Sequence, residues 1–214
     1  MPLELLLIRH GDPDYAHDRL TAQGKREALR LAADLERAGL DDLYVSPRGR
    51  ARETCGFTAE RLGMAPTVLD WASERGIRRG EIHLWEAPGD MFLRTAREDA
   101  PRDRYDLDAI IPEGREQYER VGRGCDQLLA THGYLRDGDL YRVETSTDQR
   151  IALFCHKGVI LTLLADLLHW PLQMIFVSLE IRPTGVTRLV MVEREGMGHW
   201  KAVEVGGLGH LREG

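Results

Sequence analysis

The segment Leu3–Gly11 constrains the fold more than any other part of the chain. It begins with an almost unbroken apolar run, which is typical of a strand buried on both faces in a parallel sheet. The run ends abruptly in Arg9, His10 and Gly11. Ligands of open α/β sheets bind just beyond the carboxyl ends of the strands, so the two basic side chains stand where a ligand is expected. Gly11 would let the backbone turn away or let a ligand approach it closely.

A second strand ends in the same way. The segment Ile151–Cys155 is apolar throughout and is followed by His156, Lys157 and Gly158. An apolar helix is expected to follow over 159–169. If the two strands are parallel neighbours in one sheet, their basic ends meet at the same edge of that sheet.

The first third of the chain alternates helix and strand signals. Thr21 is a plausible N-cap for a helix that stops at Gly39. Ser46 and Pro47 suit an N-cap and a first helical position, so a second helix is expected to begin there. The expected order of strand, helix, strand, helix and strand predicts a parallel sheet with right-handed crossovers, over residues 3–8, 21–38, 43–45, 46–62 and 67–69.

The middle of the chain gives weaker signals. Residues 75–133 are interpreted as an insertion that lies over the strand ends as a cap. A short helix is expected at 89–100 and a longer one at 113–132. We find no internal repeat and no linker, and we expect a single domain over 1–214.

The last third of the chain predicts mainly strands. Residues 134–148 are expected to form a polar hairpin or loop. Arg182–Gly185 has proline at its second position and glycine at its fourth, which predicts a type I turn. Three strands are expected around this turn, at 175–181, 186–193 and 199–205.

Composition narrows the classes of partner. The net charge of −6 argues against nucleic acid or an anionic membrane as the main partner, because both need a basic surface. The three cysteines are an odd number without metal-type spacing, which favours a reduced, cytoplasmic protein. No signal peptide is recognised, and the most apolar later stretch, 159–168, is too short to span a membrane.

Three strand ends carry candidate chemistry. Arg9 and His10 follow the first strand, Ser46 and Arg50 follow the second, and His156 follows the apolar strand at 151–155. Two arginines, two histidines and a helix N-terminus suit a dianion, for which phosphate is the natural candidate. The sequence has no Walker P-loop pattern and no metal-type spacing of histidines and acids.

At this point the chain resembles a known family. Leu7-Ile8-Arg9-His10-Gly11 is similar to the signature of the histidine phosphatase superfamily, which includes the cofactor-dependent phosphoglycerate mutases. The resemblance spans residues 3–211, and it implies a three-layer α/β/α sandwich with a mostly parallel central sheet. The further motifs follow in the family's order: Leu20-Thr21-x-x-Gly24, Ser46-Pro47-x-x-Arg50-Ala51-x-x-Thr54, Glu74-Arg75, His156 and His210-Leu211.

The resemblance implies phosphoryl transfer without a metal or a cofactor. His10 would attack phosphorus and become phosphohistidine. Arg9, Arg50 and His156 would hold the oxygens on which charge accumulates in the transition state. Glu74 would protonate the leaving oxygen and would then help water to attack the intermediate. The implied partner is a small phosphorylated metabolite.

Two cations are candidates for contacts with the rest of the substrate. Lys157 stands where many relatives carry glycine, so it adds a cation to the pocket or points to solvent. Arg75 belongs to a run with Arg78 and Arg79, for which a solvated face is the simpler interpretation. We keep Lys157 and Arg75 as possible substrate-binding residues.

Three functions stay open. The loop after Gly11 reaches Thr21 in nine residues, and it lacks the longer segment, with asparagine and tryptophan positions, of the mutases that the chain resembles. This difference favours a phosphomonoester hydrolase. The alternatives are a mutase that returns the phosphoryl group to its substrate, and a catalytically weak member that binds a phosphorylated ligand. The intact set Arg9, His10, Arg50 and His156 argues against the last, because a pure binder needs no nucleophile.

Overall fold

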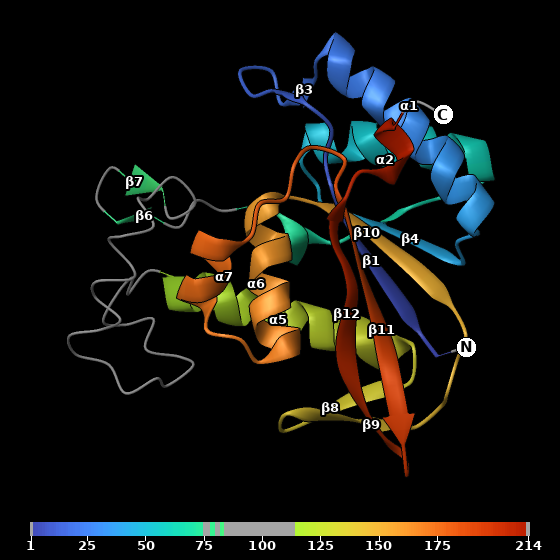
Figure 1. The fold of residues 1–214 in the computed structure, drawn as a ribbon, viewed down its shortest axis with the longest axis vertical. Helices are drawn as coiled ribbons and strands as arrows, with labels where there is room; N and C mark the ends of the chain where they lie inside the picture. Colours follow the sequence, from blue (N-terminus) through green and yellow to red (C-terminus); the bar gives the residue numbers. More distant parts are fainter. Residues whose placement is uncertain (1, 75–77, 80–81, 84–113, 213–214) are drawn as a thin grey trace.

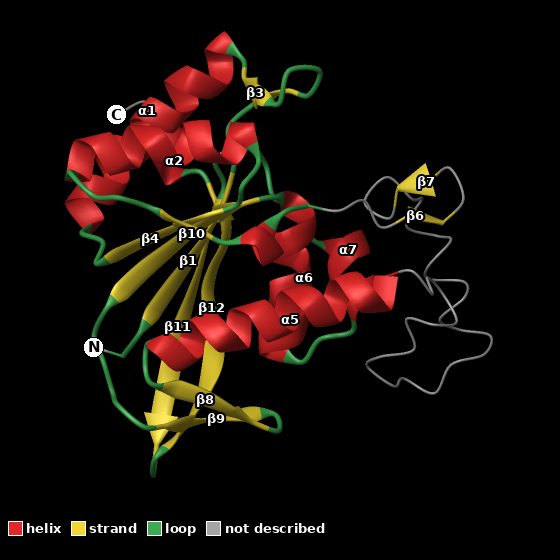
Figure 2. Ribbon diagram, turned by 180° about the vertical axis from the view of Figure 1, so that it is seen from behind, coloured by secondary structure: helices red, strands yellow, loops and turns green. Residues whose placement is uncertain are grey.

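An eight-stranded sheet forms the centre of the molecule, and helices cover both of its faces (Figure 1 and Figure 2). The computed structural model describes residues 2–74, 78–79, 82–83 and 114–212. The strand order in this sheet is β5-β4-β10-β1-β11-β12-β9-β8.

Four strands on one side of the sheet are parallel. β10 (Arg150–Cys155) lies between β1 (Glu4–Arg9) and β4 (Asp42–Val45), and β5 (Thr67–Val68) lies outside β4. The predicted alternation of strand and helix in the first third of the chain is confirmed. Because the three longer strands run in parallel, their carboxyl ends lie side by side.

The other four strands alternate in direction. β11 (Val186–Arg194) is antiparallel to β1, and each further strand is antiparallel to the one before it. β12 and β8 therefore run with β1, so six of the eight strands share one direction. The strands predicted at 186–193 and 199–205 are confirmed as β11 and β12 (Met197–Gly207), and the predicted hairpin is confirmed as β8 (Tyr134–Asp137) and β9 (Leu140–Val143).

Alternating side chains on the central strands divide the core into two layers. In β1, Leu5 and Leu7 pack into one layer, and Leu6 and Ile8 pack into the other. The layer around Leu6 lies under two long helices, and the layer around Leu5 lies under two others and a short helix at 172–178. This arrangement confirms the three-layer α/β/α sandwich. The long helices are α1 (Ala22–Ala38) and α2 (Gly49–Leu62) on one face, and α5 (Gly114–Thr131) and α6 (Lys157–Leu168) on the other.

The insertion predicted at 75–133 lies mostly outside the described residues, and so does the helix expected at 89–100. α5 is described, and its Val121, Cys125 and Leu129 are buried in the core. Residues 114–131 therefore belong, with α6, to one helical layer of the sandwich, and the predicted insertion ends too late. The cap stays a prediction for the preceding residues, and the single domain over 1–214 stays a prediction as well.

The prediction of a strand at 175–181 is wrong. The chain forms a helix there, α7 (Leu172–Ser178), which Pro171 precedes as the N-cap. Leu172, Ile175 and Phe176 are all buried. Their spacing of three and four residues is that of a helical face, and this periodicity outweighs the β-branched composition of the segment.

Two local predictions near the strand ends are also wrong. α2 begins at Gly49 with Arg48 as its N-cap, because the hydroxyl of Ser46 bonds to His156 instead of capping the helix. The turn over Arg182–Gly185 keeps its closing hydrogen bond, at 2.9 Å. The φ angle of Thr184 is +57°, however, which a type I turn does not allow.

Short elements complete the described chain. The loop after Gly11 folds back as a two-stranded hairpin. In the part of the chain that the structure describes, no helix is long and apolar enough to cross a membrane. The short elements are β2 (Pro13–Asp14), β3 (Arg19–Leu20), η1 (Asp70–Ala72), β6 (Arg78–Arg79), β7 (Ile82–His83) and η3 (Gly209–Leu211).

The contact between α5 and η1 gives a test of this packing. A Cβ atom on Gly124 would lie 2.2 Å from Cγ of the Trp71 ring, which is too close for a side chain fixed at its base. We expect Gly124→Ala to lower the free energy of unfolding by about 1–3 kcal/mol, as overpacking does. Gly56, exposed on α2, has no atom within 4 Å of its added Cβ and is the matched control. Gly56→Ala is expected to raise the free energy of unfolding by roughly 0.5–1 kcal/mol. Urea denaturation measures both, and equal effects would contradict the packing described here.

Candidate active site

Three strand ends meet at one edge of the sheet, as the sequence predicts. His10 donates its backbone N–H to Cys155 C=O at 3.0 Å, and Ser46 donates its N–H to Phe154 C=O at 2.9 Å. These bonds continue the parallel ladder one residue beyond the strands. The rings of His10 and His156 lie with their centroids 5.2 Å apart. The parallel sheet therefore brings the two histidines together from opposite parts of the chain.

The hydrogen bonds of His10 define its tautomer. Its Nδ1 lies 2.8 Å from the carbonyl oxygen of Gly11, which can only accept, so Nδ1 carries the proton. Nε2 accepts a hydrogen bond from Nε of Arg50 at 3.2 Å. Nε2 is therefore the unprotonated nitrogen, and its lone pair is the nucleophilic one.

The surroundings of His10 keep the ring neutral. The side chain is buried, and burial lowers the pKa of His10 to about 3, with Arg50 and Arg9 acting in the same direction. The bond to Gly11 opposes this shift but does not reverse it. The imidazole is therefore available as a nucleophile at neutral pH.

Arg50 is the centre of the polar network. Besides its bond to His10, its Nη1 donates to Asp18 at 2.6 Å and its Nη2 donates to Glu74 at 3.2 Å. Burial would raise the pKa of Asp18, but the N–H of Gly49 and the guanidinium of Arg50 lower it overall. Asp18 and Glu74 thus hold the guanidinium from two sides and fix its direction toward His10.

His156 is oriented by Ser46. The hydroxyl of Ser46 lies 2.8 Å from Nε2 of His156 and accepts the N–H of Arg48 at 3.4 Å. With the Ser46 hydroxyl donating its proton to Nε2, the single N–H of the neutral ring lies on Nδ1. Burial and the nearby cations, Arg50 first, lower the pKa of His156 well below its usual value. His156 is thus a neutral donor through Nδ1.

Glu74 reaches the site from the loop that follows η1. One oxygen accepts the N–H of Gly158, in the first turn of α6, at 3.1 Å. The other oxygen accepts from Arg50 and lies 3.8 Å from Nδ1 of His156. Arg120 of α5 holds this loop, because it donates to the carbonyl groups of Asp70 and Ser73. Glu74 therefore has a fixed position beside Arg50 and His156.

Two buried nitrogens of the site have no hydrogen-bond partner among the described residues. They are Nε of Arg9 and Nδ1 of His156. Both carry a proton, and a buried donor without an acceptor is costly. A phosphoryl oxygen would satisfy either of them, so their position agrees with an anion site.

Of the two cations predicted to contact the rest of the substrate, the structure describes Lys157 and not Arg75. Nζ of Lys157 pairs with Glu180 at 2.6 Å, and Glu180 also lies 3.9 Å from Nη1 of Arg9. The ammonium of Lys157 is therefore occupied by a carboxylate that is itself largely exposed. Arg75 lies outside the described residues. A role in substrate binding stays a prediction for both Lys157 and Arg75.

Sequence reasoning missed several residues of the network. Asp18 and Tyr15 come from the loop after Gly11, and the ring of Tyr15 lies 5.3 Å from the Arg50 guanidinium carbon. Thr54 accepts the N–H of Gly11 and donates to Arg50 C=O. Thr54 stands in the motif that begins at Ser46, but no role was predicted for it; its spacing of one helical turn from Arg50 was the available signal. No local pattern points to Tyr15.

Gly11 is explained by close packing. A Cβ atom at this position would lie 2.8 Å from the carbonyl oxygen of Gly24 in α1, so no side chain fits there. The glycine of the motif lets α1 approach the end of β1 next to His10.

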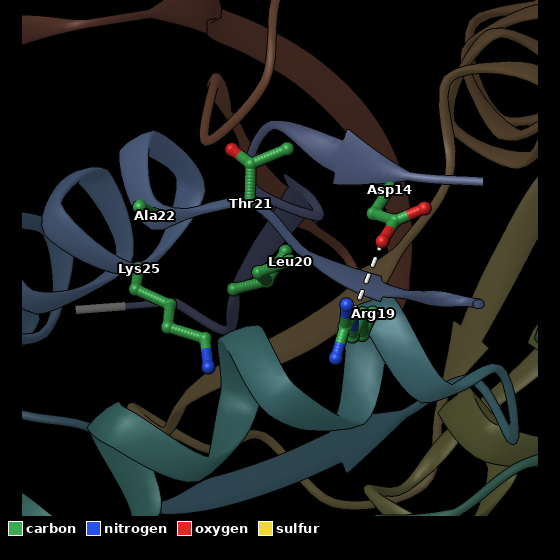
Figure 3. Close-up of a pocket in the computed structure, with 6 residues that line it drawn as sticks. All are labelled: Asp14, Arg19, Leu20, Thr21, Ala22 and Lys25. Atoms are coloured by element: carbon green, nitrogen blue, oxygen red, sulfur yellow. Dashed lines mark hydrogen bonds and ion pairs between the residues drawn. The ribbon is translucent and has the colours of Figure 1, made fainter. Parts of the chain in front are cut away.

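A hollow lies near the start of α1 (Figure 3). Its volume is about 580 Å³, and its two cations are paired, Arg19 with Asp14 and Lys25 with Glu53. None of the candidate catalytic residues lines it. Within the described ranges, no group of three histidine, cysteine or acidic residues could hold a metal ion. The hollow is lined by Asp14, Arg19, Leu20, Thr21, Ala22 and Lys25.

Comparison with known proteins defines the family. The sequence profile of the histidine phosphatase superfamily (branch 1) matches residues 5–203. The chain therefore belongs to the histidine phosphatase superfamily. The resemblance seen in the Arg9-His10-Gly11 motif is confirmed over nearly the whole chain.

Individual relatives are distant. A protein of Escherichia coli O1:K1 / APEC named "Probable phosphoglycerate mutase GpmB" is 24% identical over 155 residues, which are 61% of this chain and 70% of that protein. The structure of phosphoserine phosphatase from Entamoeba histolytica with 3-phosphoglyceric acid has a TM-score of 0.68 and 18% identity, over 98% of this chain and 100% of that one. Mycobacterial glucosyl-3-phosphoglycerate phosphatase with inorganic phosphate has a TM-score of 0.67 and 22% identity, over 98% and 99% of the two chains. At these identities the solved structures show a shared fold.

The bond between Ser46 and His156 gives a test of the site. Ser46→Ala removes the hydroxyl and leaves buried Nε2 of His156 without its partner, so the ring loses its fixed orientation. We expect kcat/KM for a phosphomonoester to fall about 10-fold, the effect of about 1.4 kcal/mol. Thr58→Ala is the matched control, because this buried hydroxyl of α2 has no partner among the described residues. A Ser46 variant as active as the Thr58 variant would contradict the role given to Ser46.

Proposed function

We propose that the protein is a phosphomonoester hydrolase that forms a phosphohistidine at His10. The observation that carries this proposal is the neutral, buried ring of His10. Its Nδ1 donates a hydrogen bond to the carbonyl oxygen of Gly11, and the lone pair of its Nε2 points at Arg50. A histidine prepared in this way is a nucleophile beside a cation. The substrate we propose is a small phosphorylated metabolite.

The first step forms a bond between Nε2 of His10 and phosphorus and breaks the bond from phosphorus to the ester oxygen. Arg9, Arg50 and His156 bind the phosphoryl oxygens and stabilise their charge in the transition state. The unpartnered donors, Nε of Arg9 and Nδ1 of His156, support this role. Arg50 exchanges its contact with His10 for a contact with phosphate as the substrate enters.

Glu74 handles the protons in both steps. It gives a proton to the leaving oxygen in the first step, which releases the alcohol. In the second step it takes a proton from water, and the water oxygen bonds to phosphorus as the bond to His10 breaks. Its distance of 3.8 Å to Nδ1 of His156 supports a position beside the phosphoryl group. The products are the alcohol and inorganic phosphate.

A mutase is the second candidate, and the name of the curated E. coli relatives supports it. The short loop after Gly11 supports hydrolysis instead, since it leaves fewer residues to retain a released product. A catalytically weak phospho-ligand binder is the third candidate, and the prepared nucleophile argues against it.

We also propose that the reaction needs neither a metal ion nor a cofactor. Arg9 and Arg50 carry the positive charge that a metal would otherwise supply.

The three cysteines are free and buried, which supports a reducing compartment such as the cytoplasm.

Hydrolysis of p-nitrophenyl phosphate in EDTA tests the proposal. We expect the protein to release p-nitrophenol in a burst followed by a slower steady rate, because the phosphoenzyme forms first. His10→Ala is expected to abolish both phases. Glu74→Gln is expected to keep a burst, because p-nitrophenolate leaves without a proton, and to lower the steady rate about 100-fold. Glu60→Gln, which changes an exposed acid of α2, is the matched control.

Two outcomes would contradict the proposal. Activity that disappears in EDTA would require a metal, and activity that survives in His10→Ala would require another nucleophile. With 3-phosphoglycerate, hydrolysis releases inorganic phosphate. An isomerised phosphoester as the main product would establish the mutase instead.

A further inference from the structure

A turn late in the chain holds the peptide backbone of the nucleophile. Thr184 donates its N–H to the carbonyl oxygen of His10 at 3.2 Å, and Arg9 donates its N–H to Gly185 C=O at 3.1 Å. β1 ends at Arg9, so these two bonds fix the direction in which the chain leaves the strand. The position of His10 therefore depends on the conformation of Thr184.

Thr184 adopts a conformation that its side chain disfavours. Its φ angle is +57° and its side chain is fully buried. A β-branched residue in the left-handed region is a genuine outlier, and glycine is the usual residue there. Such strain persists only where the surroundings hold the residue in place. A contact that holds Thr184 is therefore required.

His210 makes that contact. The hydroxyl of Thr184 donates to Pro183 C=O at 2.7 Å, so its oxygen is left to accept from Nε2 of His210 at 3.0 Å. His210 lies in η3, which packs on α1 close to the C-terminus (Figure 1). Both functions of the Thr184 hydroxyl are thus engaged, and the side chain is fixed in one orientation.

We infer that His210 is a positioning residue for the nucleophile. Its imidazole N–H holds the hydroxyl of Thr184, and the N–H of Thr184 holds the carbonyl group of His10. The inference rests on the proposed function, in which His10 attacks phosphorus. The rate of attack depends steeply on the position of the nucleophile, whereas the side chains of Arg9, Arg50 and His156 bind phosphate independently of this link.

Substitutions at His210 test the inference, because a positioning residue affects the burst rate much more than the affinity for inorganic phosphate. We expect His210→Ala to lower the rate of the p-nitrophenol burst about 10-fold and to change the Kd of inorganic phosphate by less than about 3-fold. His210→Gln is expected to restore the burst rate, because its amide nitrogen lies near the position of Nε2. His210→Asn, whose amide is too short to reach Thr184, is expected to stay slow. His199→Ala, at an exposed histidine of β12, is the control and keeps the wild-type rate.

Repeating the His210 substitution in a Thr184→Gly variant distinguishes a positioning role of His210 from a general role in packing. Glycine accepts the φ angle of Thr184 without a side-chain contact, so His210→Ala in a Thr184→Gly background is expected to cause no further loss. The inference is overturned if His210→Ala is as fast as wild type, if the Gln variant is as slow as the Ala variant, or if the loss is equal in both backgrounds. The inference is also overturned if the burst rate of His210→Ala falls only in proportion to the fraction of the protein that is folded, as measured by thermal melting. A wild-type protein without any burst would instead refute the proposed function.

Discussion

The hydrogen bond from Nε of Arg50 to Nε2 of His10 is the interaction on which the site depends. A guanidinium can donate to an imidazole nitrogen only if that nitrogen is unprotonated. The bond therefore requires a neutral ring, and burial together with the two arginines keeps the ring neutral. Arg50 in turn is held by Asp18 and Glu74, so these two acidic side chains determine where its guanidinium points.

The fold supplies this arrangement through its parallel strands. β10 lies between β1 and β4, and the residues that follow these strands are His156, His10 and Ser46. Each comes from a different part of the sequence, yet adjacent strands place them within hydrogen-bonding range of one network. The loops and helices that begin at this edge then add Arg50 from α2 and the N-terminus of α6. The network thus joins both helical layers of the sandwich.

The sequence predicted those parts of the molecule that rest on local patterns. Apolar runs identified β1 and β10, and capping residues identified α1, because burial and capping leave a direct signal in the chain. The motif residues Arg9, His10, Arg50, Glu74 and His156 do gather at one edge. Predictions failed where tertiary contacts decide. Ser46 bonds to His156 instead of capping α2, and the apolar segment of α7 follows a helical period that composition alone did not distinguish from a strand. The strained φ of Thr184 likewise depends on His210, which lies 26 residues further along.

The most direct test of the account is the site of phosphorylation. The protein can be mixed with a phosphomonoester, quenched in base during the burst, and analysed by mass spectrometry and phosphorus NMR of the peptide that contains His10. The account predicts one acid-labile phosphoramidate on Nε2 of His10, because Nδ1 donates its proton to Gly11 C=O. A phosphoryl group on Nδ1, on another residue, or in an acid-stable ester would contradict it.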